Sequence, residues 1–253
     1  MATNAQPKIN WFDGGGRGYA QFRPDYPADL ATYLASLPLQ QTRALDVGCG
    51  NGQLTLQLAA HFKEVFGLDP SKAQLEHAPA HASVTWICAP AEVMPLPGAS
   101  VDLIVAAQAA HWFDRPAFYA EARRLAAPGA VIALISYGVL RLDGTELNDR
   151  FTQFYHDEIG PYWPPERKLV DDGYRDIDFP FENLPGPALS IQRDWDLDAF
   201  LGYISTWSAV RRVVEAKRED ILAAFARDIS KLWKSDKGLH RVTWPINMRV
   251  GRL

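Results

Sequence analysis

Residues 43–52 read RALDVGCGNG, an apolar run that passes through an acid into three closely spaced glycines. The apolar positions around Asp46 have the character of a buried parallel strand. Glycine adopts backbone conformations that other residues avoid, so the run after the strand permits a tight turn and a close approach of a ligand to the backbone. The stretch therefore predicts a strand that leads into a ligand-binding turn.

A helix and a second strand are expected after this turn. Leu54 and Leu58 are four residues apart and share one helical face. Residues 64–68 read EVFGL, a short strand, and Asp69 follows it. Asp69 comes about twenty residues after Gly48, the spacing at which an acid accepts hydrogen bonds from ribose hydroxyls in a nucleotide-binding crossover. The unit therefore predicts a nucleoside ligand.

The charge near the turn indicates which nucleoside it is. The dinucleotide pattern G-x-G-x-x-G would need glycine at position 53, where the chain has Gln53. Asp46 stands two residues before Gly48, where it would repel a diphosphate and attract an ammonium or sulfonium group. These two features favour S-adenosylmethionine over NAD.

Further motifs follow in order along the chain. They are DVGCGNG at 46–52, the acid Asp69, AEVMPL at 91–96, SVDLIV at 100–105 and RLAAPGA at 124–130. Together they resemble the motifs of class I S-adenosylmethionine-dependent methyltransferases of the small-molecule type 11 group. YAQFRPDYP at 19–27 and QAAHWF at 108–113 resemble a subgroup that includes trans-aconitate-type methyltransferases.

The resemblance implies an α/β fold, the Rossmann-like class I methyltransferase sandwich. Its sheet would be mostly parallel and seven-stranded, with an antiparallel last strand and an inserted cap. We expect residues 1–137 to form the S-adenosylmethionine-binding core, 138–187 the cap and substrate region, and 188–253 the helices and strands that complete the sheet. A charged helix is expected near 214–233, and alternating apolar residues over 242–250 fit the last strand.

The resemblance and the charge pattern give a set of cofactor-binding candidates. Asp69 would bind the ribose, Arg23 the methionine carboxylate, and the rings of Tyr19 and Trp112 the sulfonium. Pro90 stands where relatives often carry an acid for the adenine amino group, which leaves Glu92 or backbone carbonyls for that role. The full set is Tyr19, Arg23, Asp46, Gly48, Gly50, Asp69, Pro70, Ala91, Glu92, Gln108 and Trp112.

The methyl acceptor is expected to meet His111 and the cap. His111 follows a predicted strand and would act as a base toward a hydroxyl acceptor, line the site, or have a structural role. A carboxylate acceptor needs no base, and His111 would then orient the cofactor or the acceptor. Tyr162, Trp163, Arg167 and Tyr174 would form an acceptor pocket, because aromatic walls with a guanidinium suit an organic acid; the alternative is ordinary packing of the cap.

Composition limits the remaining possibilities. A net charge of −4 and a pI near 5.9 supply no basic surface for a nucleic-acid backbone. Two cysteines cannot form a dense disulfide scaffold, and no run approaches the roughly 20 apolar residues of a membrane span. We expect a cytoplasmic monomer or homodimer that acts on a small molecule, without nucleic-acid or membrane partners and without a bound metal.

Three functions remain open at this point. The first is a methyltransferase that moves a methyl group from S-adenosylmethionine, leaving S-adenosylhomocysteine, to a carboxylate or hydroxyl oxygen of a small molecule. The second is an NAD-dependent oxidoreductase, which Gln53 and Asp46 oppose. The third is a catalytically silent protein that binds the cofactor on the same scaffold, because a fold alone does not settle function.

Overall fold

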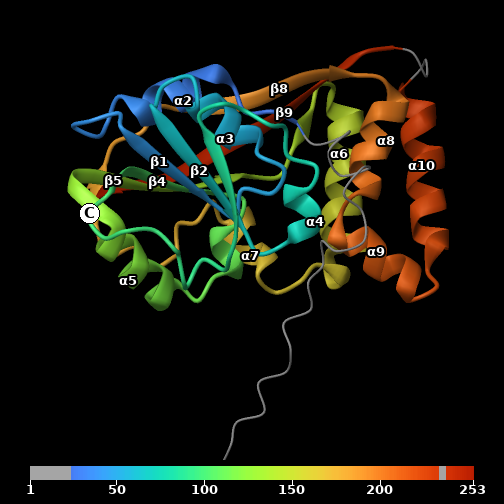
Figure 1. The fold of residues 1–253 in the computed structure, drawn as a ribbon. Coiled ribbons are helices and arrows are strands. Elements are labelled where there is room, and N and C mark those ends of the chain that lie inside the picture. The colour runs from blue at the N-terminus through green and yellow to red at the C-terminus, as the bar shows by residue number, and fades with distance from the viewer. Residues whose placement is uncertain (1–23, 234–237) are drawn as a thin grey trace, which may run out of the picture.

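A computed structural model describes residues 24–233 and 238–253, which form a twisted sheet flanked by helices (Figure 1). The strands β3-β2-β1-β4-β5 lie side by side and run parallel, and β9 pairs antiparallel with β5. The strands are β1 Arg43–Val47, β2 Glu64–Asp69, β3 Val84–Cys88, β4 Val101–Ala107, β5 Ala126–Tyr137, β6 Arg141–Leu142, β7 Glu182–Leu184, β8 Leu189–Trp195 and β9 His240–Arg252.

Helices cover both faces of the parallel part of this sheet. In Figure 1, α2 and α3 lie over one face and α5 lies under the other. The helices and helical turns are α2 Ala28–Ala35, α3 Gln53–Leu58, α4 Lys72–Leu75, η1 Ala110–Trp112, α5 Arg115–Leu125, α6 Thr145–Gln153, η2 Phe154–Glu158, η3 Gly160–Tyr162, α7 Arg167–Asp171, α8 Leu197–Ser205, α9 Ser208–Glu215 and α10 Glu219–Trp233.

The central strands are buried on both faces, which explains their nearly continuous apolar sequence. Leu103 and Val105 of β4 pack in the core on the α2 and α3 side, and Ile104 and Ala106 pack in the core on the α5 side. All four side chains are fully buried. Parallel strands with helices on both faces have this composition, and their carboxyl ends meet at one edge of the sheet.

A second group of helices, which we call the helical layer, comprises α6, α8, α9 and α10 and stands beside one end of the sheet (Figure 1). The ring of Phe154, directly after α6, stacks on Phe225 of α10 at a centroid distance of 3.7 Å. The ring centroids of Phe151 in α6 and Phe200 in α8 are 6.2 Å apart. Helices from the region expected as a cap, 138–187, therefore share one core with helices from 188–253.

The sheet agrees with the expected Rossmann-like architecture in its main features. A mostly parallel sheet with an antiparallel last strand is confirmed. The described residues divide this sheet into nine strands rather than seven, because three short strands also pair with the long β9. β6 and β8 both pair with it at Val242 and Thr243, and β7 pairs with it at residues 250–252. The expected helix near 214–233 is wrong at its start: α9 ends at Glu215, and Lys217, with φ of 57°, separates it from α10.

Candidate active site

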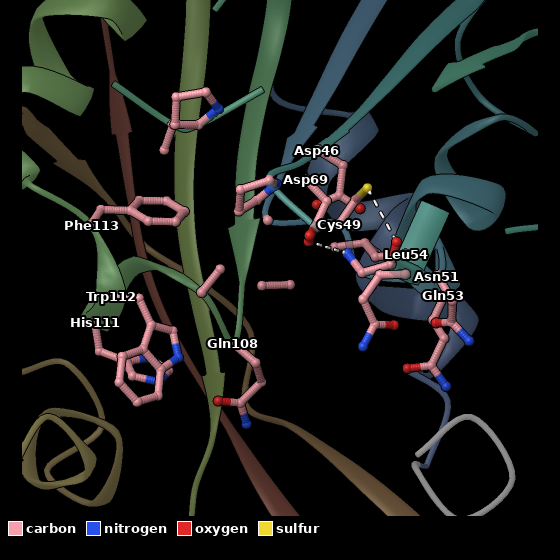
Figure 2. A pocket seen from close by; sticks show the side chains of 18 of the residues that line it. Asp46, Cys49, Asn51, Gln53, Leu54, Asp69, Gln108, His111, Trp112 and Phe113 are labelled. Carbon is pink, nitrogen blue, oxygen red and sulfur yellow. Dashed lines mark hydrogen bonds between the residues drawn. The ribbon is translucent and has the colours of Figure 1, made fainter. Parts of the chain in front are cut away.

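A cavity of about 660 Å³ opens at the carboxyl ends of β1, β2 and β4. Figure 2 shows Asp46, Cys49, Asn51 and Gln53 on one side of it, and His111, Trp112 and Phe113 on the other. The predicted residues that line it are Asp46, Gly48, Gly50, Asp69, Pro70, Ala91, Glu92, Gln108, His111 and Trp112. Tyr19 and Arg23 lie outside the residues that the structure describes. Because the carboxyl ends of parallel strands meet at one edge of the sheet, candidates that are far apart in the sequence come together here.

The glycine turn after β1 is held against the end of β2. The backbone N–H groups of Gly48 and Cys49 both donate to the carbonyl of Leu68, at 2.7 and 3.0 Å. Gly48 has φ of +72°, and a Cβ there would lie 2.4 Å from the Cβ of Ala109. Gly50 has φ of +57°, but a Cβ there would meet nothing within 4 Å. Gly48 is therefore required by close packing, whereas Gly50 faces open space.

Asp69 ties the end of β2 to this turn. Its Oδ2 accepts a hydrogen bond from the backbone N–H of Gly50, and its Oδ1 accepts one from Ser71, both at 2.8 Å. Burial raises the pKa of the Asp69 carboxyl, and the two backbone donors act in the opposite direction. A carboxylate has about four lone-pair sites, so both oxygens can still accept hydroxyl hydrogen bonds from a ligand.

Asp46 is the second carboxylate at this edge and is less completely paired. Its Oδ2 accepts a hydrogen bond of 2.7 Å from the Thr55 hydroxyl. Its Oδ1 is buried and has no partner among residues 24–233 and 238–253. Burial and, to a smaller extent, the nearby charge of Asp69 raise the pKa of Asp46 to about 7, while the Thr55 hydrogen bond acts in the opposite direction. A buried, unpaired carboxylate oxygen fits a ligand that brings positive charge.

The opposite wall begins at a turn after β4. Gln108 has φ of 55°, its backbone N–H donates to the Ile135 carbonyl at 2.8 Å, and its side-chain amide donates to the Tyr137 carbonyl at 3.0 Å. These bonds to β5 fix the turn, and η1 follows it. The rings of His111 and Trp112 lie 4.8 Å apart in η1. The turn thus places both rings at the cavity.

Glu92 joins the loop after β3 to the start of α5. Its Oε1 accepts a hydrogen bond of 2.8 Å from the backbone N–H of Asp114. Pro70 and Ala91 lie at the ends of β2 and β3 and complete this part of the lining. Pro90 also lines the cavity.

His111 is a neutral imidazole in a buried position. It is 9% exposed, and its Nδ1 lies 2.8 Å from the hydroxyl of Tyr174. Burial and the nearby Arg167 guanidinium lower its pKa from 6.5 to about 3. A neutral imidazole offers one N–H donor and one bare nitrogen.

The four acceptor candidates of the cap do not line the cavity. Tyr174 is fully buried behind His111. The Nε of Arg167 donates to Asp171 at 2.9 Å and to the Tyr155 hydroxyl at 3.0 Å, and its guanidinium lies 4.8 Å from the Trp163 ring centre. Tyr162 lies in η3 and is half-buried. Tyr174 and Arg167 therefore lie behind His111, and Glu166, next to Arg167 in the sequence, lines the cavity.

Several lining residues were not among the candidates. Asn51 belongs to the glycine turn, Gln53 and Leu54 begin α3 directly after it, and Tyr137 ends β5. Their places at strand ends would have indicated them. Glu166 lies in an irregular segment that carries no periodic signal. The full set is Tyr26, Cys49, Asn51, Gln53, Leu54, Gln74, Pro90, Ala107, Ala109, Phe113, Tyr137 and Glu166.

The chain is similar in sequence to known methyltransferases. A family model of type 11, described as a methyltransferase domain, matches residues 45–134. A provisionally assigned methyltransferase of Dictyostelium discoideum is 36% identical over 249 residues, which cover 95% of this chain and 94% of that protein. Trans-aconitate 2-methyltransferase of Methylobacterium radiotolerans is 35% identical over 120 residues, which cover 46% of each chain.

A solved structure is similar over nearly the whole chain. The structure of a provisionally assigned type II methyltransferase from Anaeromyxobacter dehalogenans matches with a TM-score of 0.86 at 46% sequence identity, and covers 91% of this chain and 98% of that one. Within the described residues, no helix is both long enough and apolar enough to span a bilayer.

Proposed function

This chain belongs to the class I methyltransferases of the type 11 group, and we propose that it transfers a methyl group from S-adenosylmethionine to an oxygen of a small molecule. The observation that carries the proposal is the arrangement of Asp46 and Asp69 around the glycine turn at one end of the cavity. Asp69 offers acceptors for two ribose hydroxyls, and the unpaired Oδ1 of Asp46 suits a cationic group nearby.

The size of the cavity is compatible with this ligand and an acceptor. Small-molecule sites occupy about 300–1,000 Å³, and this cavity of about 660 Å³ lies within that range. When bound, S-adenosylmethionine supplies a methyl group on a positively charged sulfur, and transfer breaks the carbon–sulfur bond with its electron pair left on sulfur. The residues of this chain therefore need only bind, orient and shield the reactants, and no covalent enzyme intermediate is required.

The acceptor would enter from the side of His111 and Glu166. The glycine turn and Asp69 occupy the opposite side, so the methyl group would point toward this wall. The similarity to a trans-aconitate 2-methyltransferase covers 46% of this chain. It supports a carboxylic acid as the acceptor. The choice of an anionic acceptor rests on this similarity alone, because the Arg167 guanidinium behind the wall is paired with Asp171 at 2.9 Å.

The other functions considered above have less support. The similarity to methyltransferases over nearly the whole chain does not favour an NAD-dependent oxidoreductase. A silent binding protein on the same scaffold would bind the cofactor in the same way, and only a turnover assay distinguishes it from an enzyme. The cytoplasmic location and the monomeric or dimeric state stay predictions.

Turnover tests the proposal directly. The full chain is incubated with S-adenosylmethionine and a panel of small carboxylic acids, including trans-aconitate, and of matched alcohols. We expect mass spectrometry to show a methyl ester of at least one acid together with S-adenosylhomocysteine. Binding of the cofactor without any methylated product across these acids and alcohols would support the silent binding protein instead.

A further inference from the structure

The two nitrogens of His111 lie in different surroundings. Nδ1 faces the protein interior, where the hydroxyl of Tyr174 is 2.8 Å away. His111 also lines the cavity, and its Nε2 has no hydrogen-bond partner in the part of the chain that the structure describes. The hydrogen bond at Nδ1 therefore decides what Nε2 presents to a ligand.

The hydrogen bonds of Tyr174 determine that choice. Tyr174 is 0% exposed, and Nδ1 of His111 is the only acceptor that the described residues offer to its hydroxyl hydrogen. If Nδ1 carried a hydrogen, the hydroxyl hydrogen would be buried without an acceptor, which is costly. The Tyr174 hydroxyl therefore donates to Nδ1, and the imidazole hydrogen lies on Nε2.

The backbone holds Tyr174 in this position at the expense of strain. Tyr174 has φ of 59°, which is unusual for a large side chain. The preceding Gly173 packs against Asn247 of β9, where an added Cβ would lie 2.8 Å from the Asn247 side chain. The guanidinium of Arg249, also in β9, donates to the Tyr174 carbonyl at 3.4 Å. A strained conformation that the surrounding structure enforces is typical of a functional position.

The charges around His111 oppose a second proton on its ring. Arg167 lies on the same interior side, and its positive charge disfavours an imidazolium. A base must accept a proton at its free nitrogen, but Nε2 already carries one in the tautomer that Tyr174 imposes. His111 is thus suited to donate a hydrogen bond and unsuited to remove a proton.

We propose that Tyr174 fixes His111 in the Nε2–H tautomer, so that His111 binds a carboxylate oxygen of the methyl acceptor. This inference rests on the proposed methyl transfer. Such an oxygen already carries the electron pair that forms the new carbon–oxygen bond, and no proton has to leave. His111 is then an acceptor-binding residue, and Tyr174 is a positioning residue that acts through it.

The tautomer can be read without any catalysis. Nitrogen NMR of the uniformly labelled full chain distinguishes Nε2–H from Nδ1–H imidazoles, and His111→Leu identifies the His111 signals. His77 supplies an internal reference, because its Nδ1 lies 2.8 Å from the Ala73 carbonyl and must carry the hydrogen. We expect His111 in the opposite tautomer to His77, and a mixture of tautomers in Tyr174→Phe. An Nδ1–H form of His111, or a tautomer that Tyr174→Phe leaves unchanged, would overturn the proposal.

A titration tests the acceptor class on the same signals. Succinate and the matched diol 1,4-butanediol are added to the full chain in the presence of S-adenosylhomocysteine. We expect succinate to shift the Nε2 signal of His111 at concentrations at least about 10-fold lower than the diol, since hydrogen bonds to a charged oxygen are the stronger. An equal or stronger response to the diol, or none to succinate, would overturn the carboxylate assignment. Binding of S-adenosylhomocysteine itself is measured separately by calorimetry. Its absence would count against the proposed function.

Discussion

Asp69 holds the glycine turn with the same carboxylate that we propose binds the ribose. Its two oxygens accept the backbone N–H groups of Gly50 and Ser71 at 2.8 Å, so the side chain is fixed before any ligand arrives. A fixed acceptor loses little conformational entropy on binding. The cofactor would therefore meet a site that is already formed at this residue.

Replacement of Asp69 tests this role. We expect Asp69→Ala to weaken binding of S-adenosylhomocysteine by roughly 1–3 kcal/mol, measured by calorimetry, because hydroxyl hydrogen bonds to a charged oxygen are lost. Asp102 supplies a matched control: its Oδ2 accepts the backbone N–H groups of Thr42 and Arg43, both at 2.8 Å, at the other end of the sheet. Asp102→Ala should lower stability and leave affinity unchanged. Equal affinity in wild type and Asp69→Ala would reject the ribose role.

The buried neutral state of His111 should appear in the pH dependence of stability. Its pKa is lowered from 6.5 to about 3, so between these values the unfolded chain binds a proton that the folded chain does not. The free energy of unfolding therefore falls as the pH drops below about 6.5. At pH 5 the loss from this residue is about 2 kcal/mol relative to pH 7.5.

A pair of variants isolates this effect. Urea unfolding at both pH values should show that, on going from pH 7.5 to pH 5, wild type and His61→Leu, whose histidine is exposed, lose about 2 kcal/mol relative to His111→Leu. Asp46 acts in the opposite direction: its raised pKa of about 7 gives a stability that is lost as the pH rises through that value. Because Asp46 is present in all three proteins, its effect cancels in the comparison. The same pH slope in His111→Leu as in wild type would contradict the neutral buried state.

Among the elements, the turn between β1 and α3 makes two different demands on its glycines. Gly48 needs both a left-handed backbone and the absence of a side chain, because of Ala109, while Gly50 needs the backbone alone. We expect Gly48→Ala to lower the free energy of unfolding by roughly 3 kcal/mol or more, and Gly50→Ala by about 1–2 kcal/mol. Urea unfolding measures both. A smaller loss of stability for Gly48→Ala than for Gly50→Ala would contradict the close packing of Gly48 against Ala109.

The helical layer should contribute to stability but not to cofactor binding. Phe225 is 1% exposed and stacks on Phe154 within that layer. We expect Phe225→Ala to cost about 3–5 kcal/mol of stability, as for other buried aromatic truncations. Val214→Ala, at a side chain that is 45% exposed, should change stability by less than about 0.5 kcal/mol. Affinity for S-adenosylhomocysteine should match wild type in both, and a clear loss in Phe225→Ala would connect the layer to the cofactor.

The regular elements that build the cofactor end of the site were predictable from sequence. The apolar runs before Gly48 and Gln108 predicted two buried strands, and the spacing of Asp69 from Gly48 predicted the acid at the end of a third. Parallel strands then bring their carboxyl ends together. The helical layer was less predictable, because its helices come from two separate segments whose contact depends on tertiary packing. The break between α9 and α10 shows the same limit, since Lys217 adopts a left-handed backbone without a glycine to indicate it.

At the scale of the whole molecule, the sheet supplies the cofactor end of the cavity and the segment between β6 and β7 supplies the wall behind His111. Glu166 reaches the cavity from that segment, and Tyr174 fixes His111 from it. Its aromatic and charged residues showed that it was unusual, but not which of them would face the cavity. That distinction depends on how the segment packs against β9, through contacts such as that of Gly173 with Asn247.

We propose that S-adenosylmethionine, and the S-adenosylhomocysteine that it leaves, bind at the carboxyl ends of β1 and β2. Isothermal calorimetry of the full chain with S-adenosylhomocysteine, in parallel with NADH, tests it most directly. We expect saturable one-site binding of S-adenosylhomocysteine that Asp69→Ala weakens, and no heat of binding with NADH. Saturable binding of NADH, with none of S-adenosylhomocysteine, would contradict it.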